Sequence, residues 1–223
     1  MDLAIDKFDK RRFGLITGSV CSVMFPDKGN GEKGMSSYAS ELAIRKYFKY
    51  YDEISTWQMQ HGCMNEHEAF TFYQNSYDFN LEKGLWKDVG EYGGTCDALS
   101  ADYGVDFKCP TSLDGWLDYI FTGISKQQYN QCQMYMLLFD KPLWKVCAYL
   151  TETEWMIQRE LSYPVPADKR IILVEVQRNL EWEERLIKNT PFVIEEREKY
   201  YQILCDQFGT PSTLIKEQVL ITE

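Results

Sequence analysis

The sequence lacks the features by which several large classes of protein are recognised. No apolar run in its 223 residues approaches the roughly 20 residues of a membrane-spanning helix, so we expect no membrane contact. The first ten residues alternate acidic, basic and apolar side chains, unlike a secretory signal. The seven cysteines are odd in number and form no CxxC pair, which argues against a disulfide framework and a zinc ribbon. These absences favour reduced thiols in a cytoplasm.

A surplus of basic residues is also missing. The chain has 24 Lys and Arg against 34 Asp and Glu, which gives a net charge of −10. This balance argues against a large basic face, but it leaves open a local basic channel beside carboxylates that hold metal ions. Hydrophobic residues make up 44 % of the chain and aromatic residues 15 %, which is enough for a sizeable core and excludes disorder.

The order of local patterns predicts an α/β fold with a central mixed β-sheet flanked by helices. Helical periodicity is found at 36–51, 58–75, 112–121, 126–139 and 180–208, the last interrupted at Pro191. The predicted strands are 95–99, 104–110, 144–150 and 170–177. Thr17 is expected to N-cap a short helix that reaches Met24, and the Gly-rich segment 27–34 is expected to be a flexible loop. We expect one domain over 1–223.

Two carboxylates and a lysine fall on two neighbouring predicted strands. Side chains alternate along a strand, so Asp106 and Lys108 share one face while Val105 and Phe107 share the other. Asp97 is expected to approach Asp106 from the preceding strand. Oxygen ligands of this kind suit Mg²⁺, and a lysine beside the metal can position or deprotonate an attacking water. The same residues would also fit a solvated hairpin face, so the triplet alone is weak.

A third acid, Glu66, falls inside an apolar stripe of the predicted helix 58–75. The stripe consists of Met59, Gly62, Cys63, Ala69, Phe70 and Tyr73. A carboxylate on an inward face is costly unless it is paired, so Glu66 is either a rim or salt-bridge residue or a member of a metal site.

Five segments in the first 150 residues resemble the motifs of one nuclease family. They read RFGLITGS at 12–19, GCMNE at 62–66, TCDAL at 95–99, DFKCP at 106–110, and QCQ at 131–133 followed by Met136. Their order and spacing are similar to those of the lambda-type exonucleases, the viral recombinase family of the PD-(D/E)xK superfamily. The resemblance covers about residues 10–150; the C-terminal strand and helices, 151–223, match no motif of that family.

The resemblance implies a restriction-endonuclease-like core and a role for each matching residue. Asp97, Asp106 and Glu66 become metal ligands, together with the backbone carbonyl of Phe107, for Mg²⁺ or in its place Mn²⁺. Lys108 becomes the water-positioning or general-base residue, and Gln131 a side chain that orients the water or Lys108. An iron–sulfur cluster is not expected, because only Cys205 lies in the last third of the chain.

Arg12 and Ser19 match the block that receives a 5′-phosphate in the family. An arginine fork and a helix N-terminus both favour an anion there. The sequence departs from the family pattern at two places. Asp106 stands where the family has Glu, and Asp114 stands where it has a second phosphate-binding arginine. The second departure predicts a weaker preference for a 5′-phosphate.

The function implied is a metal-dependent exodeoxyribonuclease that digests one strand of linear duplex DNA from its 5′ end and leaves 3′ overhangs for strand annealing. A homotrimer and a partner single-strand annealing protein are implied with it, in the cytoplasm of a bacterial host if the gene is carried by a phage. Two alternatives stay open: a structure-selective endonuclease or resolvase on the same fold, and a DNA-binding module whose site has decayed.

Overall fold

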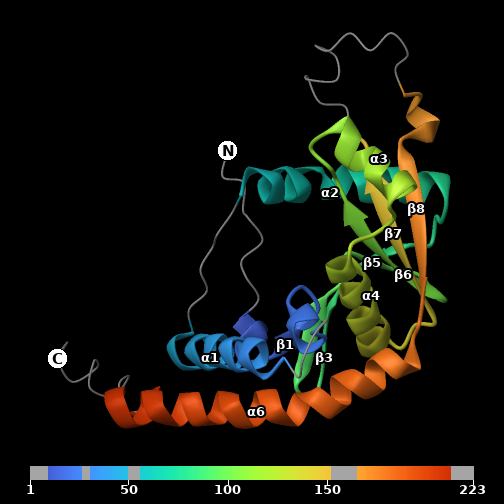
Figure 1. Cartoon of the computed structure of the whole chain (residues 1–223). Coiled ribbons are helices and arrows are strands. Elements are labelled where there is room, and N and C mark those ends of the chain that lie inside the picture. Colours follow the sequence, from blue (N-terminus) through green and yellow to red (C-terminus); the bar gives the residue numbers. More distant parts are fainter. Residues whose placement is uncertain (1–9, 27–30, 50–55, 152–164, 212–223) are drawn as a thin grey trace.

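The computed structural model describes residues 10–26, 31–49, 56–151 and 165–211, and this part of the chain is a mixed α/β fold (Figure 1). The helices are α1 (Glu32–Phe48), α2 (Trp57–Ser76), α3 (Leu113–Phe121), α4 (Lys126–Phe139) and α6 (Leu180–Phe208), with short 3-10 helices η1 (Lys10–Arg12), η2 (Cys21–Met24) and η3 (Ala167–Lys169). The strands are β1 (Ile16–Thr17), β2 (Glu82–Lys83), β3 (Trp86–Val89), β4 (Tyr92–Thr95), β5 (Ala98–Leu99), β6 (Tyr103–Lys108), β7 (Leu143–Tyr149) and β8 (Ile171–Gln177).

The described strands form two sheets. The larger has the order β2-β5-β6-β7-β8, with β6 and β7 parallel and the other neighbours antiparallel. A parallel pair needs a crossover connection, and α3 with α4 supplies it. The smaller sheet has the order β1-β4-β3, with β1 parallel to β4. The predicted mixed sheet flanked by helices is confirmed.

Helix boundaries follow the capping residues of the sequence. Ser125 begins α4 with a capping box, in which its hydroxyl accepts from the Gln128 N–H and the Gln128 side chain accepts from the Ser125 N–H. Thr56, Ser112 and Asn179 cap α2, α3 and α6 in the simpler way, each through a side-chain oxygen.

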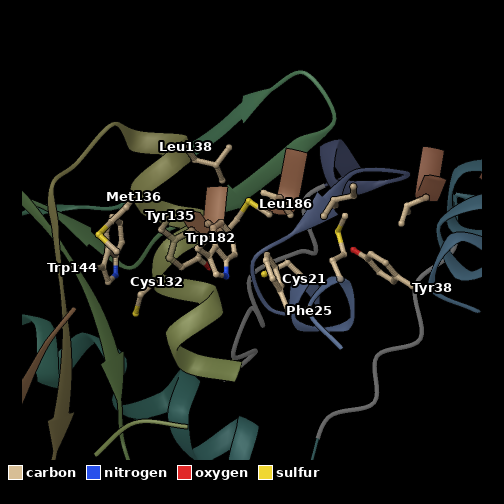
Figure 2. Close-up of a cluster of buried hydrophobic side chains, with 14 of the residues drawn as sticks. Cys21, Phe25, Tyr38, Cys132, Tyr135, Met136, Leu138, Trp144, Trp182 and Leu186 are labelled. Atoms are coloured by element: carbon tan, nitrogen blue, oxygen red, sulfur yellow. The ribbon is translucent and has the colours of Figure 1, made fainter. Parts of the chain in front are cut away.

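The largest buried cluster lies where α4, β7, η2 and α6 meet. Trp144 is fully buried, and its ring centroid lies 5.3 Å from that of Tyr135. Phe25 stacks on Trp182 at 4.7 Å. Figure 2 shows these side chains gathered from α4 (Tyr135), β7 (Trp144), the residue after η2 (Phe25) and the start of α6 (Trp182). The cluster therefore fixes α4 against the sheet and joins the N-terminal segment to the C-terminal helix.

A second buried cluster covers the opposite face of β6. Val105 and Phe107 pack there against Ala69, Phe70 and Tyr73 of α2. The alternation predicted for this strand is thus present, because its apolar side chains face α2 and leave Asp106 and Lys108 for the other face. The predicted stripe on α2 is wrong in its first half, where Met59 and Cys63 are exposed. The helix packs on the sheet mainly through its second half.

The C-terminal helix α6 runs without interruption through Pro191, which contradicts the predicted break. Tertiary contacts hold the helix on both sides of the proline. Thr190 donates to the carbonyl of Leu186 at 2.8 Å and lies 2.7 Å from the Tyr92 hydroxyl. Beyond the proline, α6 lies alongside α1 (Figure 1), and Ser36 bonds to Glu196 and Tyr200.

A buried arginine of α6 binds the N-terminal segment. Arg197 is 6 % exposed, and its guanidinium donates to the backbone carbonyl of Gly14 at 2.6 Å and to Glu91 at 2.8 Å. Its desolvation is offset by ion pairs with Glu91 and Glu198. The last helix thereby fixes the segment that enters β1.

Two local predictions near the N-terminus are wrong. Thr17 ends the strand β1 instead of capping a helix, and the helical turn that follows is the 3-10 helix η2, which begins only at Cys21 and has no side-chain cap. Residues 27–30 of the predicted loop lie outside the described residues, while Glu32 to Gly34 already form the first turn of α1. Parallel pairing of β1 with β4 overrides the local helical pattern.

All seven cysteines are free thiols. Among the described residues, no helix is both long and apolar enough to cross a membrane.

Candidate active site

The pairing of β5 with β6 sets Asp97 beside Asp106. Ala98 pairs with Val105, and one further step of the same antiparallel register puts Asp97 opposite Asp106. A hydrogen bond agrees with this placement, since the backbone N–H of Phe107 donates to the carboxylate oxygen Oδ2 of Asp97 at 2.7 Å. The two carboxylates therefore converge as the sequence predicted.

The segment before β3 holds the backbone of Asp97 from the other side. The Gly84 N–H donates to the carbonyl of Asp97 at 2.8 Å. A Cβ at Gly84 would lie 1.8 Å from the carbonyl oxygen of Cys96, so only glycine fits at this crossing. The position of Asp97 is thus fixed through its main chain as well as through its carboxylate.

Lys108 lies on the same face of β6 as Asp106. Its Nζ is 2.6 Å from Asp106 Oδ2, and the Asp106 side chain is 2 % exposed. Burial acts to lower the pKa of Lys108, but the charges of Asp106 and Asp97 outweigh it and the pKa is raised. Lys108 therefore carries a positive charge against Asp106 and within the influence of the charge of Asp97.

The pKa of Asp97 is raised well above its ordinary value. Burial is the largest cause, followed by the charge of Asp106, and the charge of Glu66 acts in the same direction. Two acids share this centre with one lysine, so negative charge is left over in a poorly solvated place. The donors are hard oxygens, and the centre fits a divalent cation such as Mg²⁺ or Mn²⁺.

Glu66 lies on α2 and is half-buried. Its charge acts on Asp97 and also raises the pKa of Cys109, so the structure brings it into the electrostatic environment of the pair. In the described residues, however, no three His, Cys, Asp or Glu side chains stand close enough together to hold a metal ion. Glu66 therefore acts on Asp97 through its charge, but it does not form a three-carboxylate cluster with Asp97 and Asp106 in the described structure.

Gln131 lies on α4 and faces the segment that follows β1. Its Nε2 donates to the Tyr135 hydroxyl at 3.1 Å. A Cβ on Gly18 would lie 3.5 Å from Gln131 Cγ, so the helix and the segment are in close contact. Tyr135, which no sequence motif indicated, has a buried phenol that lies within the influence of the charges of Asp106 and Asp97. Position 135 carries no signal in the primary sequence beyond its spacing from Gln131.

The structure does not place Arg12 and Ser19 at a helix N-terminus. Arg12 belongs to η1, and its guanidinium lies 6.0 Å from the ring centroid of Trp86, with Arg11 at 5.1 Å from the same ring. Ser19 is exposed in the turn before η2, and its carbonyl accepts from Gln127 at 3.0 Å. Because η2 is a single 3-10 turn, it offers no helix dipole that would favour an anion here. The arginines of η1, which lie beside Trp86 of β3, still favour an anion site.

The fold built around this centre is that of known exonucleases. The chain is similar to the crystal structure of an alkaline exonuclease (LHK-Exo) from Laribacter hongkongensis, with a TM-score of 0.71 and 17 % identity over 88 % of this chain and 94 % of that one. It is similar to a phage related exonuclease from Haemophilus somnus 129PT, with a TM-score of 0.71 and 18 % identity over 86 % and 96 %. LHK-Exo in complex with dAMP matches with a TM-score of 0.66 and 18 % identity over 89 % and 95 %.

No family model and no curated protein matches the chain. The structural matches extend over most of this chain and nearly the whole of the chains it matches. The predicted exonuclease fold is thereby confirmed.

Proposed function

We propose that the protein is a metal-dependent exodeoxyribonuclease that hydrolyses one strand of linear duplex DNA, from 5′ to 3′, and leaves 3′ overhangs for recombination by strand annealing. The observation that carries the proposal is the set of Asp97 and the buried Asp106 on neighbouring strand positions, with Lys108 in contact with Asp106, in an exonuclease fold. One of the similar structures, LHK-Exo, is in complex with a deoxynucleotide, dAMP.

The residues divide the work of phosphodiester hydrolysis among them. Asp97 and Asp106 would hold Mg²⁺ or Mn²⁺, with the Phe107 carbonyl and Glu66 beside them. Such an ion polarises a phosphoryl oxygen and lowers the pKa of water. Lys108 places a positive charge where negative charge grows on the phosphorus oxygens, and it orients the water. Gln131 orients the same water through its amide.

Closed circular and linear duplexes of the same sequence test the proposal most directly. We expect digestion of the linear duplex in Mg²⁺, none of the closed circle, and none of either in excess EDTA. Cleavage of the closed circle would favour the alternative of a structure-selective endonuclease. Full activity in EDTA would contradict a metal mechanism, and binding without cleavage under every condition would leave a DNA-binding module.

A modest preference for a 5′-phosphate belongs to the same proposal. Arg12 would supply one charged hydrogen bond to the phosphate, with Ser19 beside it, while Asp114 occupies the place of a second arginine. Because one charged hydrogen bond contributes about 1.5–3 kcal/mol, we expect the preference to be on the order of 10- to 100-fold and to be lost in Arg12→Ala. Initial rates on duplexes that differ only at the 5′ end measure it. Equal wild-type rates on the two ends would assign Arg12 and Ser19 a structural role.

The proposal includes a homotrimer and a single-strand annealing protein as partner. A protomer with a net charge of −10 binds DNA well only if its basic residues are gathered, and a ring can turn them inward. We expect a mass near three protomers by light scattering at micromolar concentration. A monomeric mass combined with processive digestion would exclude an encircling channel.

A further inference from the structure

Tyr135 is held by two glycines from separate parts of the chain. The residue is 5 % exposed. A Cβ on Gly18, in the turn after β1, would lie 3.3 Å from Tyr135 Cε1, and a Cβ on Gly94, in β4, would lie 2.9 Å from the same atom. Both backbone segments thus press on one edge of the ring, which fixes the direction of its hydroxyl.

The hydroxyl is directed to the side chain one helical turn before it. Gln131 Nε2 donates to the Tyr135 oxygen at 3.1 Å. This bond uses one of the two amide N–H donors and leaves Gln131 Oε1 as an acceptor, while the phenol keeps its own proton to donate. Burial raises the pKa of Tyr135, and the charges of Asp106 and Asp97 raise it further, so the proton stays on the phenol.

We propose that Tyr135 is a positioning residue of the reaction, which holds the Gln131 amide so that its oxygen is aimed at the attacking water beside Asp97 and Asp106. The inference rests on the proposed function and adds to it a residue that acts through Gln131. An amide alone on a helix surface rotates among several rotamers, and the bond to a fixed hydroxyl selects one of them.

If Tyr135 had only a structural role, the protein would need its ring but not its hydroxyl. The ring belongs to the main buried cluster and packs against Trp144 at 5.3 Å and Phe139 at 6.4 Å. Those contacts need the ring and not the hydroxyl. Tyr135→Phe keeps the ring and removes the bond to Gln131, so it separates the two roles.

The matched control is Tyr129→Phe, in the same helix. That hydroxyl accepts from Asn179 Nδ2 at 3.1 Å, so the variant also removes one hydrogen bond, but at a place that has no predicted site residue. Equal melting temperatures for the two variants would show that both substitutions destabilise the fold to the same extent.

The test is a double-mutant cycle in single-turnover digestion of a linear duplex. Tyr135→Phe is expected to lower the rate about tenfold, the loss of roughly one neutral hydrogen bond in the transition state. Gln131→Ala should lower it at least as much, and the double variant no further than Gln131→Ala. Tyr129→Phe should keep the wild-type rate. Duplex binding in EDTA should be unchanged in Tyr135→Phe, and the Gln131 side-chain amide NMR signals should shift without substrate or metal.

Two results would overturn the inference while the proposed function stands. In the first, Tyr135→Phe digests DNA at the rate of Tyr129→Phe and the Gln131 amide signals do not shift. In the second, the rate effects of Tyr135→Phe and Gln131→Ala multiply in full in the double variant, which would make the two side chains independent. An inactive wild type is a distinct outcome, because it removes the proposed function and this inference together.

Discussion

Replacement of Lys108 by alanine is expected to slow single-turnover DNA cleavage by about 10²- to 10⁴-fold, the range over which a positioned acid–base group contributes. The reason lies in the geometry: Lys108 Nζ is 2.6 Å from Asp106, and the charges of Asp106 and Asp97 raise the pKa of Lys108, so it stays charged. Duplex binding in EDTA should change much less than the rate, because one cation is a small part of a DNA-binding surface. An unchanged rate would mean that Lys108 only forms an ion pair with the buried Asp106 and has no part in cleavage.

Two further lysine variants sharpen the Lys108 experiment. Lys108→Arg keeps the charge but spreads it over a planar fork, so we expect it to stay well below the wild type. Lys145→Ala removes a lysine from the neighbouring strand β7, where the side chain pairs with Glu175 at 3.7 Å and lies over the Tyr103 ring. That variant should keep the wild-type rate, because no site residue depends on Lys145.

Asp97→Asn is expected to reduce cleavage on the order of 10³-fold or more while making the metal-free protein more stable. The amide keeps an oxygen for the Phe107 N–H and removes the charge. The folded-state pKa of Asp97 is raised, so the ionised form costs stability at pH 7, and a neutral side chain restores it. Thermal unfolding in EDTA measures the gain, and a lower melting temperature would contradict it.

Asp78→Asn is the control, because it is expected to change the stability in the opposite direction from Asp97→Asn. Hydrogen bonds from Ser100 at 2.6 Å and Tyr103 at 2.7 Å lower the pKa of Asp78. Its ionised form therefore stabilises the fold above the unfolded pKa, and that contribution is lost as the pH falls through the lower folded pKa. The amide variant should lose stability at pH 7 and keep its nuclease rate.

The parts of the fold that could be read from the sequence are those that local chemistry decides. The helix predicted at 126–139 is found with the same ends, because Ser125 and Gln128 form a complete capping box before an unbroken helical segment. Alternation along 104–108 placed Asp106 and Lys108 on one face, since the pleat of a strand leaves no other arrangement.

The misses occur where distant parts of the chain decide the local structure. Thr17 has the pattern of a helix cap, but it pairs with Gly93 in a parallel strand. Pro191 reads as a helix end, but α6 continues because α1, Tyr92 and the buried Arg197 hold both halves of it. Tyr135 was missed for the same reason, since its role depends on Gly18 and Gly94, which only the fold brings to it.

The bond from Arg197 to the Gly14 carbonyl has a consequence for the order in which the protein is made. The two residues are 183 positions apart, and synthesis delivers the N-terminal segment first. A chain still on the ribosome has Arg12, Ser19 and the carboxylate strands but not the helix that fixes the entry to β1. The nascent protein therefore cannot fix the entry to β1 until translation has passed Arg197. A nonsense mutation between Met136 and Arg197 should yield a product that retains every motif residue and still lacks an ordered N-terminal block.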